Sequence, residues 1–179
     1  AAACLFQKTF MKRFIFSFLL AASLFSCKKN KCEDDRCDIQ AAYAHNATKQ
    51  TITQGVWGTV SMMEGNCMPV IDPNNTTCKH CPVKRSVKIY EYTLQSQATP
   101  VTNNSIFYTS FQTNLITEVM TDEEGFFQAT LPAGRYSIAI LEDGKLYVNI
   151  TDGMSGLNPV DIQNGPVKFN VSMTYKAVF

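Results

Sequence analysis

Three cysteines and a histidine lie close together in the stretch CMPVIDPNNTTCKHC, residues 67–81. Thiolate and imidazole groups bind zinc, and a metal site here would use all four side chains: Cys67, Cys78, His80 and Cys81. A thiol oxidoreductase would use the pair in Cys78-x-x-Cys81. A structural disulfide would join Cys67 to Cys78 or Cys81 and close a loop. Which chemistry applies depends on the compartment that the chain reaches and on the elements that carry the loop.

The N-terminal part of the chain contains a segment that is typical of secretory signals. Two basic residues, Lys12 and Arg13, precede an apolar run at residues 14–25, as in a signal peptide. This run is well short of the roughly 20 residues that a membrane-spanning helix needs. We therefore predict a cleaved signal peptide at residues 11–26, and no structural role for residues 1–10, which precede it.

The residues Leu24-Phe25-Ser26-Cys27 resemble the lipobox of bacterial lipoproteins, in which the cysteine is acylated on sulfur and becomes the new N-terminus. An ordinary signal peptide cut nearby would leave Cys27 as a plain thiol. The position of Cys27 directly after the apolar run, and before the polar tract KKNKCEDDR, favours lipidation. Because several acyl chains together give stable anchoring, we expect a membrane anchor at Cys27, followed by a polar tether over residues 27–50.

An exported chain meets an oxidising environment, in which disulfides are the default state of cysteine pairs. Beyond Cys27 the chain has five more cysteines: Cys32, Cys37, Cys67, Cys78 and Cys81. An odd number leaves at least one thiol over. We expect Cys32 and Cys37 to close a small loop in the tether, and the loop at residues 67–81 to be held by a structural disulfide. The remaining thiol of that loop is then either buried or paired with Cys32 or Cys37.

The loop lacks residues and structural context that a zinc site or a redox site would need. No second C-x-x-C and no spaced histidine pair completes a zinc site. Cys78 and Cys81 lack the βαβ context of a thioredoxin-like motif, and Pro82 stands where a haem-binding C-x-x-C-H motif needs histidine. A structural disulfide is therefore the favoured hypothesis, with no metal, no cofactor and no chemical task for His80.

Charge and motif content argue against several classes of function. The chain has 16 basic and 15 acidic side chains, and loss of residues 1–26 would remove basic ones only. Nucleic-acid binding needs a basic patch that neutralises phosphates, so we expect no nucleic-acid partner. The sequence shows no phosphate loop, no H-E-x-x-H motif and no recognisable Ser-His-Asp set. We therefore predict that the protein is not an enzyme.

From about residue 51 the chain consists of short β-rich segments separated by turn sequences. We predict strands at residues 56–63, 85–94, 115–121, 126–131, 135–141, 145–150 and 168–179. Apolar residues recur at every second position in several of these segments, which is typical of strands with one buried face. The sequence therefore predicts an all-β fold, an antiparallel β-sandwich of about seven strands over residues 51–179.

The turn sequences carry a family resemblance. TDEEGFFQATLPAGRYSIAI, which follows GVWGTV and VKIYEY, is similar to the carboxypeptidase regulatory-like domain, a transthyretin-like (prealbumin-like) sandwich of bacterial envelope proteins. The positions that match the family pattern are Thr121, Asp122, Gly125, Phe127, Leu131, Pro132, Gly134 and Tyr136. The resemblance covers residues 52 to about 150 and implies the fold, with Asp122 capping a turn, Gly125 relieving the backbone and Phe127 in the core. It implies little about chemistry.

Together these observations predict a lipid-anchored β-sandwich of the cell envelope, at the outer membrane of a Gram-negative bacterium, with a structural role or with a protein or glycan partner. A glycine-rich loop after the predicted strand at 145–150 offers candidate binding residues: Asp152, Gly153 and Asn158. A plain connector between two strands explains the same loop and is the favoured hypothesis. The alternative function is a metal-binding or redox loop at residues 67–81.

Overall fold

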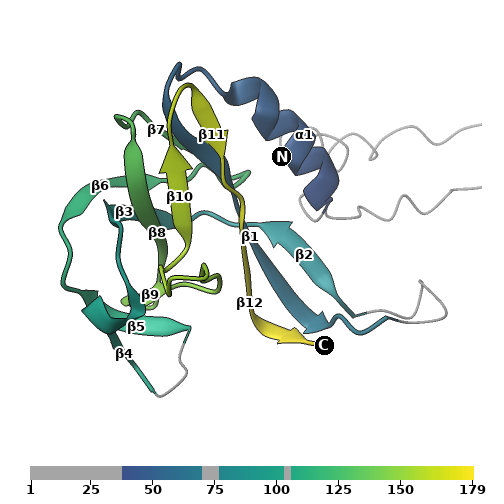
Figure 1. Ribbon diagram of the computed structural model, residues 1–179. Helices are drawn as coiled ribbons and strands as arrows, with labels where there is room; N and C mark the ends of the chain where they lie inside the picture. Colours follow the sequence, from purple (N-terminus) through teal and green to yellow (C-terminus); the bar gives the residue numbers. More distant parts are fainter. Residues whose placement is uncertain (1–37, 70–76, 103–105) are drawn as a thin grey trace, which may run out of the picture. The chain divides into compact units, whose positions relative to one another are not determined.

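The computed structural model describes residues 38–69, 77–102 and 106–179. The predicted signal peptide, the lipidation site Cys27 and the tether cysteines Cys32 and Cys37 lie outside these residues. Within them, no helix has the length and apolar character needed to cross a membrane. The elements, shown in Figure 1, are α1 (Ile39–Lys49), β1 (Gly55–Asn66), β2 (Lys79–Pro82), β3 (Ser86–Glu91), the 3-10 turn η3 (Gln95–Gln97), β4 (Ala98–Pro100), β5 (Phe107–Phe111), β6 (Leu115–Met120), β7 (Phe126–Ala129), β8 (Gly134–Glu142), β9 (Lys145–Tyr147), β10 (Pro159–Ile162), β11 (Pro166–Lys168) and β12 (Val171–Val178).

Two β-sheets make up most of the described part of the chain. In the five-stranded sheet, β1 pairs in parallel with β11 and β12 and antiparallel with β2 and β7. The seven-stranded sheet has the order β4-β5-β9-β8-β3-β6, with β10 paired to the start of β8. The predicted all-β sandwich is therefore confirmed, but it contains more strands than the seven or so expected.

The residues that alternate along the predicted strands form the core between the sheets. Buried apolar side chains from five strands pack together: Val56 and Val60 of β1, Val87 and Ile89 of β3, Phe127 of β7, Ile138 and Ile140 of β8, and Val171 and Met173 of β12. Each such side chain contributes about 1.5–3 kcal/mol when it is fully buried. The period-two pattern thus identified the inner faces of β3, β8 and β12.

Strand β8 is buried on both faces. The segment between β3 and β6 contributes to the cover on its second face. A second apolar cluster lies on the face opposite the main core: Ala98, Tyr108, Ala139, Leu146, Val148 and Leu157. Strands β4 and β5 lie within residues 93–115, a long polar segment with an aromatic patch, and Tyr108 and Phe111 of β5 pack in or against this cluster. The sequence missed these strands because they are only three and five residues long.

The turn between β6 and β7 has the structure that the family resemblance implies. Asp122 Oδ1 accepts hydrogen bonds from the backbone N–H groups of Glu124 and Phe126, at 3.0 and 2.9 Å, and so caps the turn. Gly125 has φ 71°, a left-handed conformation that glycine adopts without steric cost. A side chain at Gly125 would also meet the Val60 carbonyl oxygen at 2.3 Å.

Helix α1 occupies part of the segment predicted as a polar tether, residues 27–50. Asp38 caps the helix by accepting hydrogen bonds from the N–H groups of Gln40 and Ala41. The helix contacts β1 and β2, and its buried residues are Ile39, Ala42 and Asn46. The weakly periodic stretch IQAAYAHNA within the expected tether therefore forms a helix that packs against the sandwich.

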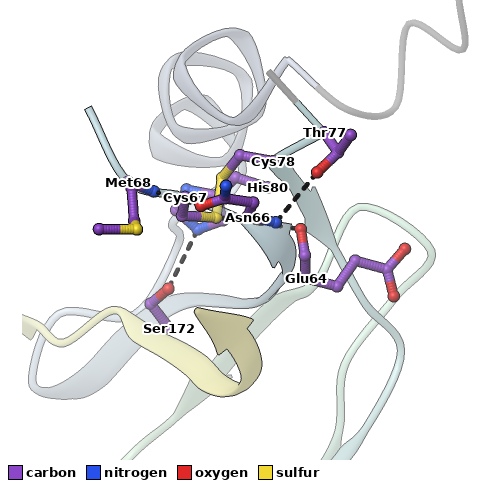
Figure 2. The surroundings of a disulfide bond; sticks show 8 residues. All are labelled: Glu64, Asn66, Cys67, Met68, Thr77, Cys78, His80 and Ser172. Atoms are coloured by element: carbon purple, nitrogen blue, oxygen red, sulfur yellow. Dashed lines mark hydrogen bonds between the residues drawn. A yellow bond between two sulfur atoms is a disulfide. The ribbon is translucent and has the colours of Figure 1, made fainter. Parts of the chain in front are cut away.

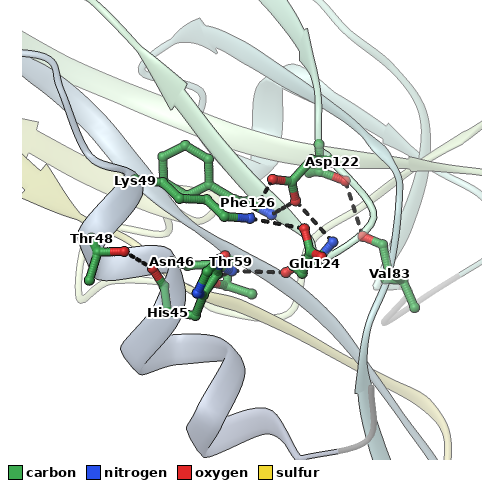
Figure 3. A network of polar contacts seen from close by, with 10 residues as sticks. His45, Asn46, Thr48, Lys49, Thr59, Val83, Asp122, Glu124 and Phe126 are labelled. Carbon is green, nitrogen blue, oxygen red and sulfur yellow. Dashed lines mark hydrogen bonds and ion pairs between the residues drawn. The ribbon is translucent and has the colours of Figure 1, made fainter. Parts of the chain in front are cut away.

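Polar contacts fix α1 to β1 and to the turn between β6 and β7 (Figure 3). Asn46 is fully buried, and its Nδ2 donates to Thr59 Oγ1 at 2.9 Å and to the Glu124 carbonyl at 2.8 Å. Lys49 Nζ forms ion pairs with the carboxylates of Asp122 and Glu124 at 2.7 and 2.9 Å. The sequence did not reveal this docking because Asn46 and Glu124 are 78 residues apart.

Candidate functional site

A disulfide between Cys67 and Cys78 closes the loop that follows β1 (Figure 2). Strands β1 and β2 are antiparallel neighbours, with Met63 of β1 opposite His80 of β2. Cys67 and Cys78 therefore stand at the two ends of a hairpin loop, and their Cα atoms are 4.7 Å apart. The predicted structural disulfide is confirmed, and the partner of Cys67 is Cys78.

The backbone beside the disulfide is held in place by further contacts. Asn66 N–H donates to Thr77 Oγ1 at 3.1 Å, and Cys67 N–H donates to the Val178 carbonyl at 2.8 Å. Gly65 has φ 87°, and a side chain there would meet the Thr77 carbonyl oxygen at 2.3 Å. In the chain-entropy model, a disulfide that closes a loop of this size stabilises the folded state by about 3 kcal/mol.

Cys81 is disulfide-bonded as well. The thiol that an odd number of cysteines leaves over is therefore none of Cys67, Cys78 and Cys81. A zinc site would need thiolates at these positions, and the redox site considered above would need Cys78 to exchange disulfides with Cys81. The observed bonding assembles neither arrangement, and the described residues contain no group of three or more metal-ligating side chains suited to an ion.

His80, which the sequence placed in a loop without a task, lies on β2 and connects three strands. Its Nε2 is 2.8 Å from Ser61 Oγ of β1 and 3.1 Å from Ser172 Oγ of β12, and Figure 2 shows the contact with Ser172 beside the disulfide. Ser61 is fully buried. Burial lowers the pKa of His80 and so favours the neutral imidazole. The sequence could not show this cluster because His80 and Ser172 are 92 residues apart.

The chemistry open to the Ser61–His80–Ser172 cluster is limited. In a serine hydrolase, a carboxylate holds the histidine in the correct tautomer, and backbone donors stabilise the oxyanion. Within the described residues, the imidazole of His80 hydrogen-bonds with the hydroxyl groups of Ser61 and Ser172, and no carboxylate contacts it. Ser61 Oγ also lies 3.4 Å from the Val171 carbonyl. We therefore interpret the cluster as a polar link between strands.

The candidate binding residue Asp152 is engaged inside its own loop. Its Oδ1 accepts from the N–H groups of Met154 and Gly156, both at 2.8 Å. Its Oδ2 accepts from Tyr92 Oη at 2.8 Å and from Arg135 Nη2 at 2.6 Å. The hydrogen bond from Gly156, together with these other contacts, lowers the pKa of Asp152 despite opposing desolvation. The carboxylate thus organises the loop.

Asn158 has a structural role as well. It is fully buried, and its Oδ1 accepts from Ile150 N–H at 2.9 Å while its Nδ2 donates to the Ile138 carbonyl at 2.9 Å. Gly153 is exposed, with open space around it. Two of the three candidate binding residues therefore hold the connector between β9 and β10 in place, which favours the interpretation as a plain connector.

A third polar group, which the sequence did not indicate, links β8, β12 and the residue directly before β3. Glu142 is 5% exposed. It forms an ion pair with Arg85 and accepts a hydrogen bond from Tyr175 Oη at 2.5 Å. Burial and the nearby carboxylate both raise the pKa of Tyr175. The only sequence signal was the period-two position of Tyr175 on the inner face of the last strand.

Comparison with known proteins does not identify the chain. No family model matches it, and neither does any curated protein or solved structure. The resemblance to the carboxypeptidase regulatory-like domain therefore depends on the matching residues themselves and on their roles in the fold.

Proposed function

We propose that this protein is a non-catalytic, lipid-anchored β-sandwich of the cell envelope that has a structural or binding role, with a protein or glycan partner. The observation that carries the proposal is the disulfide between Cys67 and Cys78, because stable disulfides form in oxidising compartments outside the cytosol. The signal-like segment at residues 11–26 and the lipobox-like residues that end at Cys27 support export and anchoring at the outer membrane of a Gram-negative bacterium.

The roles of the polar side chains support a binding or structural function over a catalytic one. His80, Asp152 and Glu142 each have two or more hydrogen-bond or ion-pair partners, and each links segments of the chain. A catalytic acid or base instead needs to reach a substrate. Each of the three groups is used to position strands or a loop.

Membership of the carboxypeptidase regulatory-like group is part of the proposal. Asp122 and Gly125 shape the turn before β7, Phe127 lies in the core, and Tyr136 Oη donates to the Pro132 carbonyl at 3.1 Å. These matching positions all serve the fold. Domains of this kind act as accessory modules beside transporters and enzymes, and the resemblance extends that expectation to this chain by analogy.

Membrane fractionation of cells that express the full-length chain tests the proposal. The wild-type protein should sediment with outer membranes and dissolve in detergent, whereas Cys27→Ala should lose the acyl chains and the membrane association they provide. The double variant Cys67→Ala/Cys78→Ala serves as a matched control, because it removes cysteines but keeps the anchor. A wild-type protein in the soluble fraction with unmodified Cys27 would overturn the proposed anchoring.

A further inference from the structure

Strand β6, at one end of the seven-stranded sheet, exposes an apolar edge. Among its six residues, Leu115 is 45% exposed, Ile116 43% and Met120 58%. An edge strand presents unpaired N–H and C=O groups, and proteins usually protect such edges with proline, charge or a covering segment. An edge that combines free backbone groups with three large apolar side chains is therefore a candidate interaction surface.

The other edge strands of the described residues are protected. Four of them contain a proline, which cannot donate a backbone hydrogen bond to an added strand: Pro82 in β2, Pro100 in β4, Pro159 in β10 and Pro166 in β11. The edge of β12 is occupied at one position, where Thr174 N–H donates to Tyr147 Oη at 3.0 Å. Strand β7 has no exposed side chain. By contrast, β6 has no proline and exposes apolar residues.

The pairing pattern shows which backbone groups of β6 face outward. Thr121, directly after β6, donates its N–H to the Arg85 carbonyl at 2.9 Å. In an antiparallel pair only alternate residues exchange hydrogen bonds with the neighbouring strand. In this register Val119 exchanges bonds with β3. The N–H and C=O groups of Glu118 and Met120 therefore point away from the sheet, where a further strand would lie.

The outward edge of β6 alternates between apolar and acidic side chains. Glu118 and Met120 occupy alternate positions of the strand, and Ile116 lies two positions before Glu118, at the point where the register of β6 against β3 shifts. Glu118 forms an ion pair with Lys88 at 2.5 Å, but the Glu118 side chain is 42% exposed while that of Lys88 is 17% exposed. The carboxylate is thus the more accessible member of the pair, and a cation from a partner strand can approach it.

The neighbouring turn adds to the acidic character of this edge. It carries three carboxylates, those of Asp122, Glu123 and Glu124, and two ammonium groups pair with them, those of Lys49 and Lys84. One negative charge remains unbalanced beside the end of β6. This excess favours a partner strand that carries positive charge.

We infer that β6 accepts an extended peptide segment of a partner protein as an additional antiparallel strand, with apolar residues opposite Ile116 and Met120 and a lysine or arginine opposite Glu118. This mode, β-augmentation, takes its affinity from main-chain hydrogen bonds and its specificity from alternate side chains. The inference rests on the proposed binding function and names the class of partner.

A second copy of the chain fits this edge less well than a basic peptide. Antiparallel pairing of two β6 strands about Glu118 would place the two Glu118 carboxylates directly opposite each other, and like charges in that position are destabilising. A strand of six residues is also a short contact, whereas stable interfaces between proteins bury at least about 1,200 Å².

The test uses the full-length, detergent-extracted protein and a fluorescently labelled synthetic peptide, Ser-Ile-Thr-Lys-Thr-Ile-Ser, that has the inferred alternation. Fluorescence anisotropy should show saturable binding with a Kd below 1 mM. Ile116→Lys and Met120→Lys should each weaken binding at least tenfold. Met154→Lys is the matched control, because Met154 is an equally exposed methionine (62%) away from β6, and it should bind like the wild type.

A charge exchange gives the second arm of the test. The same peptide with glutamate in place of lysine should bind the wild type at least tenfold more weakly and should regain binding to the Glu118→Lys variant. Circular dichroism melts confirm that each variant is folded. The inference is wrong if no saturable binding occurs up to 1 mM, if Met154→Lys weakens binding as much as Met120→Lys, or if the charge exchange has no effect.

Two further observations separate this inference from its alternatives. A wild-type dimer in analytical ultracentrifugation that Met120→Lys abolishes would replace the peptide with a second copy. Absence of peptide binding in a protein whose Cys27 is acylated would overturn the role of β6 and leave the proposed envelope location standing.

Discussion

Glu142, at the end of β8, is a carboxylate that the fold keeps charged although it is buried. Burial raises the pKa of Glu142, but hydrogen bonds from Arg85 and Tyr175 outweigh burial and bring the pKa below its usual value. A glutamate whose pKa falls on folding stabilises the folded state above its unfolded pKa of about 4.3. This contribution is lost as the pH falls through the folded pKa.

Substitution of Glu142 tests whether the hydrogen bonds from Arg85 and Tyr175 outweigh the cost of burying the carboxylate. Glu142→Gln removes the charge that Arg85 and Tyr175 bind, and should lower the free energy of unfolding at pH 7 by about 1.5–3 kcal/mol, typical of hydrogen bonds to charged groups. Glu123→Gln is the control, because the Glu123 side chain is 76% exposed and pairs with Lys84 at the surface, where such pairs contribute about 0–1 kcal/mol.

Urea titrations at pH 7 and at pH 3 measure both effects. The difference between wild type and Glu142→Gln should be present at pH 7 and shrink at pH 3, where protonation removes the wild-type advantage. Equal stability of the two proteins at pH 7 would show that Glu142 has no net stabilising role.

His80 predicts a second pH dependence, in a higher range. Burial lowers its pKa, so the unfolded state binds a proton more readily than the folded state does. The wild type should therefore lose stability as the pH falls from about 6.5 through the folded pKa of His80. His80→Gln, which keeps a polar side chain between Ser61 and Ser172, should lose less stability between pH 7 and 5.

The control for His80 is His45→Gln, since His45 is exposed on helix α1. In urea titrations at pH 7 and pH 5, this variant should follow the wild type. A His80→Gln variant that follows the wild type as closely would show that protonation of His80 does not affect folding.

At the scale of elements, the sequence predicted strands whose apolar residues alternate and missed elements that depend on distant contacts. The period-two residues of β3, β8 and β12 lie in the core as expected, and the turn after β6 contains the predicted cap. Strands β2, β4, β10 and β11 have only three or four residues each and contain proline. Such segments have too few alternations to be recognised as strands.

In the candidate site, too, the sequence predicted the feature that depends on local spacing and missed the contacts between distant residues. The spacing of Cys67, Cys78 and Cys81 predicted a disulfide with two alternative partners, and the hairpin of β1 and β2 selected Cys78. The contacts of His80 and Asp152 arise from pairings between remote strands and loops. Patterns within a short window contain no information about such pairings.

Docking of helix α1 yields a prediction at this scale. Asn46→Ala would leave Thr59 Oγ1 and the Glu124 carbonyl without a buried donor, and should lower the free energy of unfolding by about 1–3 kcal/mol. Thr48→Ala, on the same helix, removes only an exposed hydrogen bond to the His45 carbonyl and should cost less than about 0.5 kcal/mol. Guanidinium titrations measure both variants, and equal losses would contradict the docking role of Asn46.

The disulfide between Cys67 and Cys78 leads to a further prediction about stability. The double variant Cys67→Ala/Cys78→Ala should lower the free energy of unfolding by about 2–4 kcal/mol, because the unfolded chain regains the entropy of the open loop. Ser110→Ala, a substitution at an exposed position of β5, is the control for the effect of replacing a small polar side chain by alanine. A double variant as stable as the wild type in guanidinium titrations would mean that the disulfide does not stabilise this fold.

At the scale of the whole molecule, the proposed lipid anchor at Cys27 would hold a disulfide-stabilised β-sandwich at a membrane, and we expect its edge strand β6 to bind partners. Its polar clusters hold strands together, and the near balance of 16 basic and 15 acidic side chains does not favour a polyanionic partner. We therefore expect the function to lie at the surface of the sandwich, near the membrane to which the proposed anchor would attach it.

Peptide mass spectrometry of the protein extracted from native membranes, without reduction and with free thiols labelled, tests the central claim most directly. The account predicts acyl chains on Cys27, a disulfide-linked pair of peptides that contain Cys67 and Cys78, and no thiol label on Cys81. Unmodified Cys27 together with labelled Cys67, Cys78 and Cys81 would contradict both the export of the chain and the disulfide, and would make metal binding by these thiols the next question.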